Sequence, residues 1–353
     1  MKTNTLLTTV SAFCLLHSAF GQGALTPPGT PAPTMKSLAQ IEPRTDVLKL
    51  AGDGFNLFII AQPGSYYLTT NLVVAGARNG ITITTNNVTL DLSGFTIFST
   101  GNGGGAAGTG IYLKGEVAHI AIRNGNITGG VTNNGAGSYF GAGFFSGIDY
   151  DLGTPDDVRV ANVSVSGCGG NGINLGNNSI LVESCTVNTV GSSGIVASTV
   201  KSSVALDCGN DAIHGIQVSD CRGQSTSGIG VSASTAQNCY GSSGSGTGIS
   251  ANTAQNCEGS SNGGGGTYGL YAITALNSYG SSGSGSGLIA NTAQNCEGVS
   301  GGGSYGVYAL DIATGCSGYS SGGTGLSAFI ANGCRGQTGS GTALSATHNV
   351  NSF

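Results

Sequence analysis

The charged side chains best placed for acid–base chemistry lie in one short segment, ALDCGNDAIHGIQVSDCRG, at residues 205–223. Asp207 and Asp220 each directly precede a cysteine. A repeating fold that stacks these two positions would bring both carboxylates within about 5 Å of each other on neighbouring strands. Such a pair could bind calcium, or divide the acid and nucleophile roles of glycoside hydrolysis. His214 lies between them and could assist proton transfer.

The predicted catalytic residues are therefore Asp207, Asp211, His214 and Asp220, and Asp207 and Asp220 are the predicted calcium ligands. The competing interpretation is structural. Aspartate caps turns readily, and later repeats carry asparagine before the cysteine. Beyond Gln224 the charged residues are too sparse for a catalytic groove, namely Glu258, Glu297, Asp311 and Arg335.

A second acidic group lies in GIDYDLGTPDDVRV at residues 147–160, with Asp149, Asp151, Asp156, Asp157 and Arg159. Carboxylate oxygens bind calcium, but the spacing of a twelve-residue calcium loop is missing, which favours a solvated loop. Nearby, we expect Arg123 to pair with a neighbouring repeat and His119 to face solvent.

Near-identical segments recur in the second half of the chain. They read GIGVSASTAQNCYGSS from Gly228, GTGISANTAQNCEGSS from Gly246 and GSGLIANTAQNCEGVS from Gly285. A glycine followed by an aliphatic residue also recurs, as at Gly215–Ile216 and Gly248–Ile249. Several glycines interrupt each unit, and NVTLDLSGFTI alternates as a strand does, which excludes helices. A period near 20 predicts an all-β parallel solenoid of about a dozen coils, roughly 60 Å long.

Stacked coils place equivalent residues in columns. The predicted interior column of small thiols is Cys221, Cys239, Cys257, Cys296 and Cys334. Ser278 takes the same place, which favours reduced thiols over obligatory disulfides, although stacked cysteines are close enough to be bridged. Cys316 is offset by one residue, which predicts a distortion at ALDIATGC. Before the cysteines, a second column of turn-forming amides comprises Asn238, Asn256, Asn277 and Asn295.

Composition bounds the class of protein. The chain has 353 residues with 65 glycines, no tryptophan and only 8% charged residues, which suits a narrow, elongated core. The net charge is -5 and no cluster of lysine and arginine is present, so we expect no nucleic-acid partner.

The N-terminus has the pattern of a secretory signal, with Lys2 before an apolar run and small residues near Gly21. The predicted organisation is a signal peptide at 1–21, a proline-rich linker at 22–40, an N-terminal β cap at 41–79 and repeats at 80–353. The apolar run is too short for a stable membrane span. We expect a secreted, cell-surface or periplasmic protein.

Residues 134–145, NGAGSYFGAGFF, depart from the period and form an insertion rich in aromatic residues. These rings could stack on sugars, or cover the side of the solenoid. Tyrosines also recur near the turns of the later coils, where a glycan surface and simple stacked packing both remain open.

The segments PTMKSLAQIEPRT, QPGSYYLTTNL and NGITITTNNVTLDLSGFTI, followed by the repeats, resemble secreted right-handed parallel β-helix proteins. This is the pectate-lyase-like superfamily, in the form found in Verrucomicrobia and Planctomycetes. The resemblance implies a right-handed, single-stranded β-helix from about Gly80 onward. It says little about activity, because one fold carries many functions.

The leading hypothesis is a structural, adhesive or polysaccharide-binding protein whose partner is a polysaccharide or cell-surface glycan. The alternative is a polysaccharide lyase or glycoside hydrolase, which calcium could assist. A third hypothesis is ice binding by a single column, Thr235, Thr253, Thr274 and Thr292. An uncovered last coil would expose a sheet edge, which could support an oligomer.

Overall fold

The computed structural model describes residues 43–99, 101, 105–151, 153–264 and 266–353. The expected signal peptide and proline-rich linker lie outside these residues. Arg44–Phe353 forms one compact unit. Its main sheet has 32 strands in a parallel β-solenoid of about 16 turns, more than the dozen expected. Within the described part, the helical element is the short 3-10 helix η1 (Val47–Lys49).

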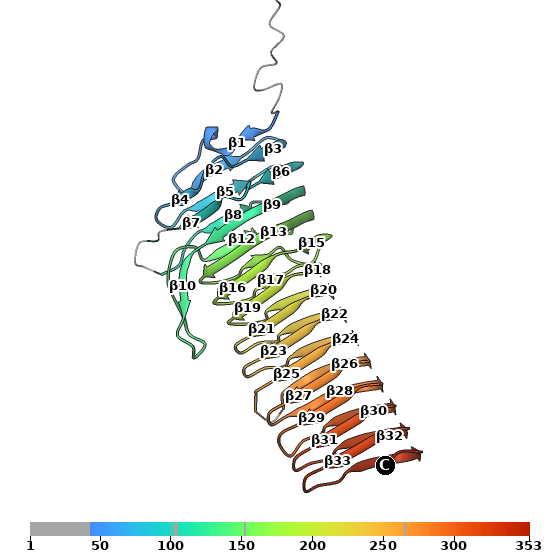
Figure 1. The fold of residues 1–353 in the computed structure, drawn as a ribbon. Coiled ribbons are helices and arrows are strands. Elements are labelled where there is room, and N and C mark those ends of the chain that lie inside the picture. Colours follow the sequence, from blue (N-terminus) through green and yellow to red (C-terminus); the bar gives the residue numbers. More distant parts are fainter. Residues whose placement is uncertain (1–42, 100, 102–104, 152, 265) are drawn as a thin grey trace, which may run out of the picture. The chain divides into compact units, whose positions relative to one another are not determined.

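Each coil crosses three faces in turn, which we call faces A, B and C (Figure 1). Face A is the ladder of β2 (Asn56–Ile60), β5 (Asn79–Ile83), β8 (Thr109–Leu113), β12 (Ser146–Tyr150), β14 (Ile173–Asn174), β17 (Ile195–Val196), β20 (Ile213–Ser219), β22 (Val231–Gln237), β24 (Ile249–Gln255), β26 (Tyr268–Leu276), β28 (Ser286–Gln294), β30 (Val307–Thr314), β32 (Leu326–Asn332) and β34 (Leu344–Val350).

Face B is formed by β1 (Thr45–Asp46), β3 (Gly64–Tyr67), β6 (Val88–Asp91), the first part of β9 (Ala118–Thr128) and of β13 (Asp156–Cys168), β15 (Ile180–Glu183), β18 (Thr199–Lys201) and the second part of each face A strand from β20 onward. Face C is formed by β4 (Leu72–Val74), β7 (Thr96–Ser99), the second part of β9 and β13, β16 (Thr186–Val190), β19 (Val204–Cys208), β21 (Arg222–Ser225), β23 (Tyr240–Ser243), β25 (Glu258–Ser261), β27 (Tyr279–Ser282), β29 (Glu297–Ser300), β31 (Ser317–Ser320) and β33 (Arg335–Thr338).

Regular coils begin ahead of Gly80. Strands β2, β3 and β4 already pair in parallel with β5, β6 and β7. Before them, β1 pairs with β3, and the buried Val47 of η1 belongs to the hydrophobic core. Among the described residues, no helix is long and apolar enough to cross a membrane.

The insertion forms a hairpin of its own. Strands β10 (Gly130–Asn133) and β11 (Tyr139–Ala142) pair antiparallel in a separate two-stranded sheet. Figure 1 shows this hairpin extending alongside the following coils. Phe144, just after it, is fully buried in the core, whereas Phe140 is 58% exposed. The insertion therefore buries one aromatic ring in the core and leaves another exposed to solvent.

Inward side chains stack in columns that fill the core. The longest is aliphatic and runs along face A through Ile81, Ile111, Ile148, Ile173, Ile195, Ile213, Val231, Ile249, Leu270, Leu288, Val307, Leu326 and Leu344. In the coil of β20 the column takes Ile213, not the expected Ile216, because Gly215 pairs with Ala233. Ile216 is 45% exposed as a result.

The core narrows in the later coils because glycines bring faces A and C into direct contact. Gly223, Gly241, Gly259, Gly280, Gly298, Gly318 and Gly336 form one column on face C. A Cβ atom at Gly259 would lie 2.1 Å from the carbonyl oxygen of Gly269 on face A. This close approach of the two backbones explains why the repeats contain so many glycines.

The predicted cysteine column exists, and the nine cysteines of the described residues are buried free thiols. Register places Cys221, Cys239, Cys257, Ser278 and Cys296 at one position of successive coils. Cys316 stays in register because a bulge between Ala309 and Ile312 absorbs the extra residue, which confirms the distortion expected at ALDIATGC. Cys208 belongs to a different column, opposite Val190 and Ser225.

The asparagine column is also confirmed. Asn238, Asn256, Asn277 and Asn295 all have φ between 47° and 52°, the left-handed region that asparagine tolerates. The side-chain amides of Asn256, Asn277 and Asn295 each donate to the oxygen of the preceding asparagine in the column, at 3.2–3.4 Å. The column therefore turns the chain from face B to face C and links the coils at the same time.

Candidate functional site

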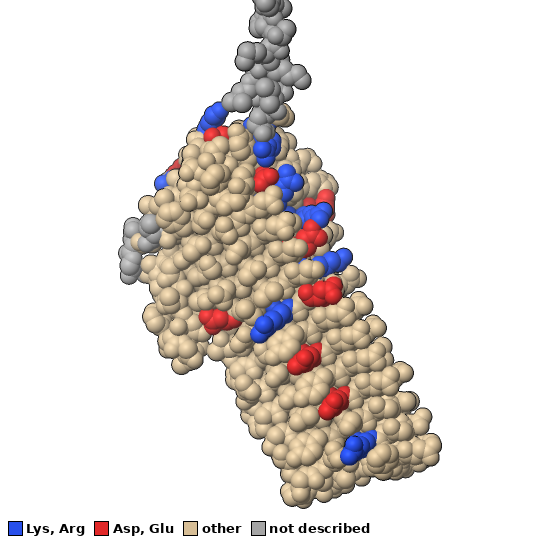
Figure 2. All heavy atoms as spheres, in the orientation of Figure 1, with Lys and Arg blue, Asp and Glu red and all other residues tan. Residues whose placement is uncertain are grey.

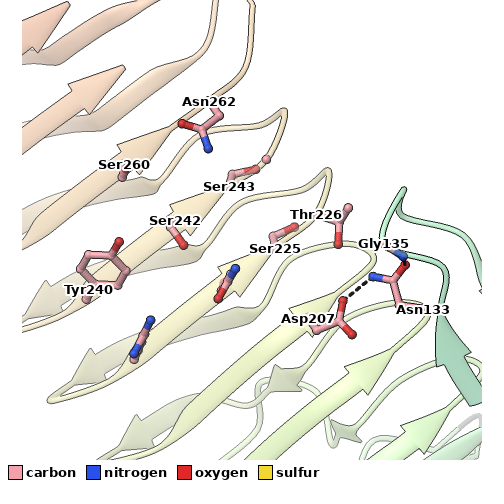
Figure 3. Close-up of a pocket in the computed structure, with 13 residues that line it drawn as sticks. Asn133, Gly135, Asp207, Ser225, Thr226, Tyr240, Ser242, Ser243, Ser260 and Asn262 are labelled. Atoms are coloured by element: carbon pink, nitrogen blue, oxygen red, sulfur yellow. Dashed lines mark hydrogen bonds between the residues drawn. The ribbon is translucent and has the colours of Figure 1, made fainter. Parts of the chain in front are cut away.

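A hollow on the surface lies on face C beside the hairpin (Figure 3). Its volume is about 580 Å³. The lining residues come from the hairpin and from β19, β21, β23, β25 and the turns that follow them: Asn133, Gly135, Asp207, Arg222, Gln224, Ser225, Thr226, Tyr240, Ser242, Ser243, Gly244, Ser260 and Asn262. We call this hollow the face C groove.

The hairpin forms one wall of the groove by bonding to Asp207. The Asn133 amide donates to Asp207 Oδ1, as the dashed line in Figure 3 shows. The Tyr139 hydroxyl donates to the same oxygen at 2.9 Å and lies 2.9 Å from Thr226 Oγ1. Burial, and to a lesser degree the Asp207 carboxylate, raises the pKa of Tyr139 well above its usual range. The phenol therefore stays a neutral donor.

Asp207 sits at an irregularity in the sheet. Its φ is 52°, and the register between β19 and β21 shifts between Ala205 and Cys208. Bulges of this kind redirect a side chain and are common beside functional sites. Here the bulge lies where the carboxylate meets the hairpin, at the end of the groove.

The floor of the groove is polar with one aromatic ring. Arg222 on β21 is directly opposite Tyr240 on β23, and its guanidinium lies 5.3 Å from the centre of the tyrosine ring. Ser242, also on β23, pairs with Ser260 on the next strand of this face, β25 (Figure 3). Hydroxyl and amide groups with a tyrosine suit the hydroxyl groups and apolar faces of sugars.

The predicted pairing of Asp207 with Asp220 is wrong. Register places Asp220 between Ser202 and Asn238, and its Oδ1 accepts from the Asn238 amide at 3.0 Å. The two aspartates are at opposite ends of face C strands. The reason is coil length: Asp220 and Asn238 are 18 residues apart, whereas Asp207 precedes Asp220 by only 13.

Asp211 and His214 do not complete a catalytic set either. Asp211 Oδ1 accepts from the backbone amide of Ile229 in the next coil at 2.8 Å. His214 lies on face A, with Nδ1 4.0 Å from Asp211 Oδ2. Asp220 thus has the structural role weighed above, and Asp211 links its coil to the next one.

The predicted calcium site is not assembled. Asp207 and Asp220 cannot share an ion, because they lie at different corners of the coil. Across the described ranges, no three His, Cys, Asp or Glu side chains are grouped closely enough to hold a metal.

Two aspartates of the second acidic group are bonded to neighbouring side chains. Asp149 Oδ1 accepts from the Asn174 amide at 2.9 Å, and Asp157 lies 2.7 Å from His119 Nδ1. The His119 side chain is 61% exposed, as expected for a residue facing solvent. Asp149 lies on β12 and Asp157 on β13, so these two residues are on strands and not in the solvated loop that the spacing favoured.

Arginines of the early coils form pairs between coils. Arg123 Nε lies 3.3 Å from Asp91, which is directly opposite on the neighbouring strand, and this confirms the expected pairing. Arg159 forms an ion pair with Glu183. Both pairs are on face B, away from the face C groove.

The threonine column stacks as predicted on face B through Thr235, Thr253, Thr274 and Thr292. It ends at Ile312 in the next coil. The column is one residue wide, and glutamines or leucine lie beside it at positions 237, 255, 276 and 294. A flat threonine surface is therefore not formed.

No protein-family model, curated protein or solved structure matches this chain. The evidence for function comes from the groove itself.

Sequence reasoning missed most of the groove. Tyr139 belongs to the aromatic-rich insertion, but its bond to Asp207 spans 68 residues of sequence, and that of Asn133 spans 74. The signal that was present is the break in the period at residues 134–145. A break marks an insertion, but does not say which coil it reaches.

Proposed function

We propose that this protein is a secreted, non-catalytic β-solenoid that binds an extended polysaccharide along face C. The observation that carries the proposal is the face C groove, where a protruding hairpin meets a polar floor. Its volume lies within the usual range for a small-molecule site of about 300–1,000 Å³. The secretory pattern of the first 21 residues supports export.

The surface beyond the groove supports a long ligand over a small one. From Arg222 and Tyr240 the same outward column continues through Glu258, Tyr279 and Glu297. Figure 2 shows the charged side chains of these later coils in a line down the visible face. Aromatic and charged groups repeat along that line, so successive sugar units could meet similar contacts.

Binding without cleavage is favoured by the number of carboxylates. A glycoside hydrolase of the usual kind uses two, about 5–9.5 Å apart. The groove lining contains one carboxylate, that of Asp207, and its Oδ1 already accepts hydrogen bonds from Asn133 and Tyr139. The lyase or hydrolase alternative would need a second acid, or a bound calcium, that reaches this groove.

Binding to immobilised polysaccharides tests the proposal. We expect the Tyr240→Ala and Arg222→Ala variants to bind about fivefold to tenfold more weakly, because an aromatic contact contributes roughly 0.5–1.5 kcal/mol. The control is Tyr271→Ala, an exposed tyrosine on face A. Equal binding by all three variants and the wild-type chain would contradict the groove as the site.

The same samples are assayed with calcium for new reducing ends and unsaturated products. We expect none. Cleavage that disappears in an Asp207→Asn variant would replace the binding proposal with the enzyme alternative.

A further inference from the structure

Beyond the face C groove, acidic and aromatic side chains alternate along one outward column. Register stacks Tyr240, Glu258, Tyr279 and Glu297 on four successive coils. Parallel strands lie about 4.8 Å apart, so Tyr279 has a glutamate on the coil at each side, and the Cα atoms of the two glutamates are about 10 Å apart. We call Glu258, Tyr279 and Glu297 the Glu–Tyr–Glu triplet.

The two carboxylates of the triplet are not neutralised by the protein itself. Both glutamates are exposed, and within the part of the chain that the structure describes neither forms an ion pair. The cations of the same column are Arg222 and Arg335, each two coils, or about 10 Å, from the nearer glutamate. Because the Debye length is about 8 Å at physiological ionic strength, salt largely screens the arginines from the triplet.

The ring of Tyr279 is partly exposed between the two carboxylates. Arg222 packs on the equivalent ring of Tyr240, whereas no described guanidinium or ring packs on Tyr279. The next outward column consists of short side chains, which leave a shallow strip beside the triplet: Ser260, Ser281 and Val299.

A tyrosine ring with a carboxylate on each side suits a positively charged group. An ammonium over the face of the ring is attracted by the ring quadrupole. At that position it is also about one coil spacing, about 4.8 Å, from the coil of each glutamate. A polymer of uronic acids would bring its own carboxylates against the two unpaired ones and be repelled. The triplet therefore selects a ligand by its positive charge.

We propose that the polysaccharide bound along face C is an amino sugar polymer, with a protonated amine over the Glu–Tyr–Glu triplet. This inference rests on the proposed function and specifies its substrate class. The neighbouring serines favour a sugar chain over a basic peptide. The hydroxyl groups of Ser260 and Ser281 have no hydrogen-bond partner among the described residues, so they are free to bond to sugar hydroxyl groups. The apolar stems of lysine side chains would leave them unpaired.

Two matched sugar oligomers test the proposal by titration calorimetry. One is a β-1,4-linked glucosamine oligomer, and the other is the same oligomer with every amine acetylated, which removes the positive charge and keeps the sugar chain. The titrations are run at about pH 6, where glutamate is ionised. We expect the wild-type chain to bind the free-amine oligomer about tenfold more tightly than the acetylated one. This preference should shrink as salt is added.

Substitutions that remove one charge each locate the preference. Glu297→Gln should reduce it about threefold, since an exposed ion pair is weak. The double variant Glu258→Gln, Glu297→Gln should bind the two oligomers equally. The matched control is Asp311→Asn, which removes an exposed carboxylate at the bulge in β30, outside face C. It should keep the wild-type preference, and a loss as large as that of Glu297→Gln would show that only the net charge matters.

The outcomes separate this inference from the proposed function. Equal binding of both oligomers by the wild-type chain, with Tyr240→Ala weakening both, would overturn the amine assignment and leave polysaccharide binding standing. Binding of neither oligomer, nor of any polysaccharide tested, would overturn both proposals. An oligolysine of equal charge that bound more tightly, and depended on the same two glutamates, would identify a basic peptide as the ligand and overturn the assignment to a sugar.

Discussion

Asp207 illustrates how residues distant in sequence set the role of one side chain. Its neighbours in sequence, a leucine and a cysteine, give it no partner. In the folded chain Asn133 and Tyr139 of the hairpin both donate to it, and Thr226 lies against the tyrosine hydroxyl. A carboxylate that might have been a nucleophile thereby becomes the anchor of a groove wall.

The buried thiols predict a pH dependence of stability. Burial raises the pKa of Cys168 to about 12, and those of Cys185 and Cys221 to about 11, from the usual 9.0. The unfolded chain therefore loses these protons near pH 9, while the folded chain keeps them. The free energy of unfolding should fall as pH rises from about 9 to about 11, by up to about 1.4 kcal/mol per thiol per pH unit.

Urea midpoints measured at pH 8 and pH 10 check this expectation. The control carries Cys185→Ser and Cys221→Ser, because serine occurs naturally in the same column at Ser203 and Ser278. Its midpoint should fall less between the two pH values. An identical fall in both proteins would show that other groups cause the dependence.

At the scale of a single turn, the asparagine column combines a backbone requirement with a side-chain bond. Asn256 has φ 52° and donates its amide to Asn238 at 3.2 Å. Glycine occupies the same turn in later coils, at Gly315 and Gly333, where φ is 61° and 60°. The turn therefore requires the left-handed backbone conformation in every coil, whereas the side-chain amide bond is present only where asparagine occupies the position.

Substitutions at Asn256 separate these two needs. Asn256→Ala should lower the unfolding free energy by about 1–2 kcal/mol, because a Cβ-bearing residue without a polar side chain strains this backbone. Asn256→Gly relieves the strain, so its unfolding free energy should fall by less than that of Asn256→Ala, although both variants lose the side-chain amide bond. Chemical unfolding followed by circular dichroism measures the difference, and a larger loss for glycine would contradict it.

For the whole solenoid, the contact between faces A and C determines how wide the core can be. In the early coils, faces A and C both contribute aliphatic side chains to the core. In the later coils, glycines take the place of these side chains on face C and pack against the backbone of face A. Serines at the end of face C strands then complete the turn: Ser243 Oγ donates to the Gly228 carbonyl at 2.6 Å and accepts from Gly246 at 2.7 Å.

A glycine pair tests this packing. Gly259→Ala places a Cβ 2.1 Å from the Gly269 carbonyl oxygen, whereas Gly303 has nothing within 4 Å of the same position. We expect Gly259→Ala to cost about 2–3 kcal/mol of stability, as overpacked sites do, and Gly303→Ala to cost little. Thermal unfolding of the two variants measures this, and equal melting temperatures would exclude the direct contact.

The sequence alone determined the solenoid, because its columns depend on a period that is visible in the letters. The alternating strands, the cysteine and asparagine columns and the shift at Cys316 all follow from equivalent positions stacking in successive coils. The expected alignment of Asp207 with Asp220 failed for the same reason that the columns succeeded: only residues one full coil apart can stack. Tertiary structure decided the groove, since the length and direction of an inserted hairpin depend on packing with coils far along the chain. It also decided which glycine–aliphatic pairs face the core, because a shift of one or two residues at a corner leaves the local pattern unchanged.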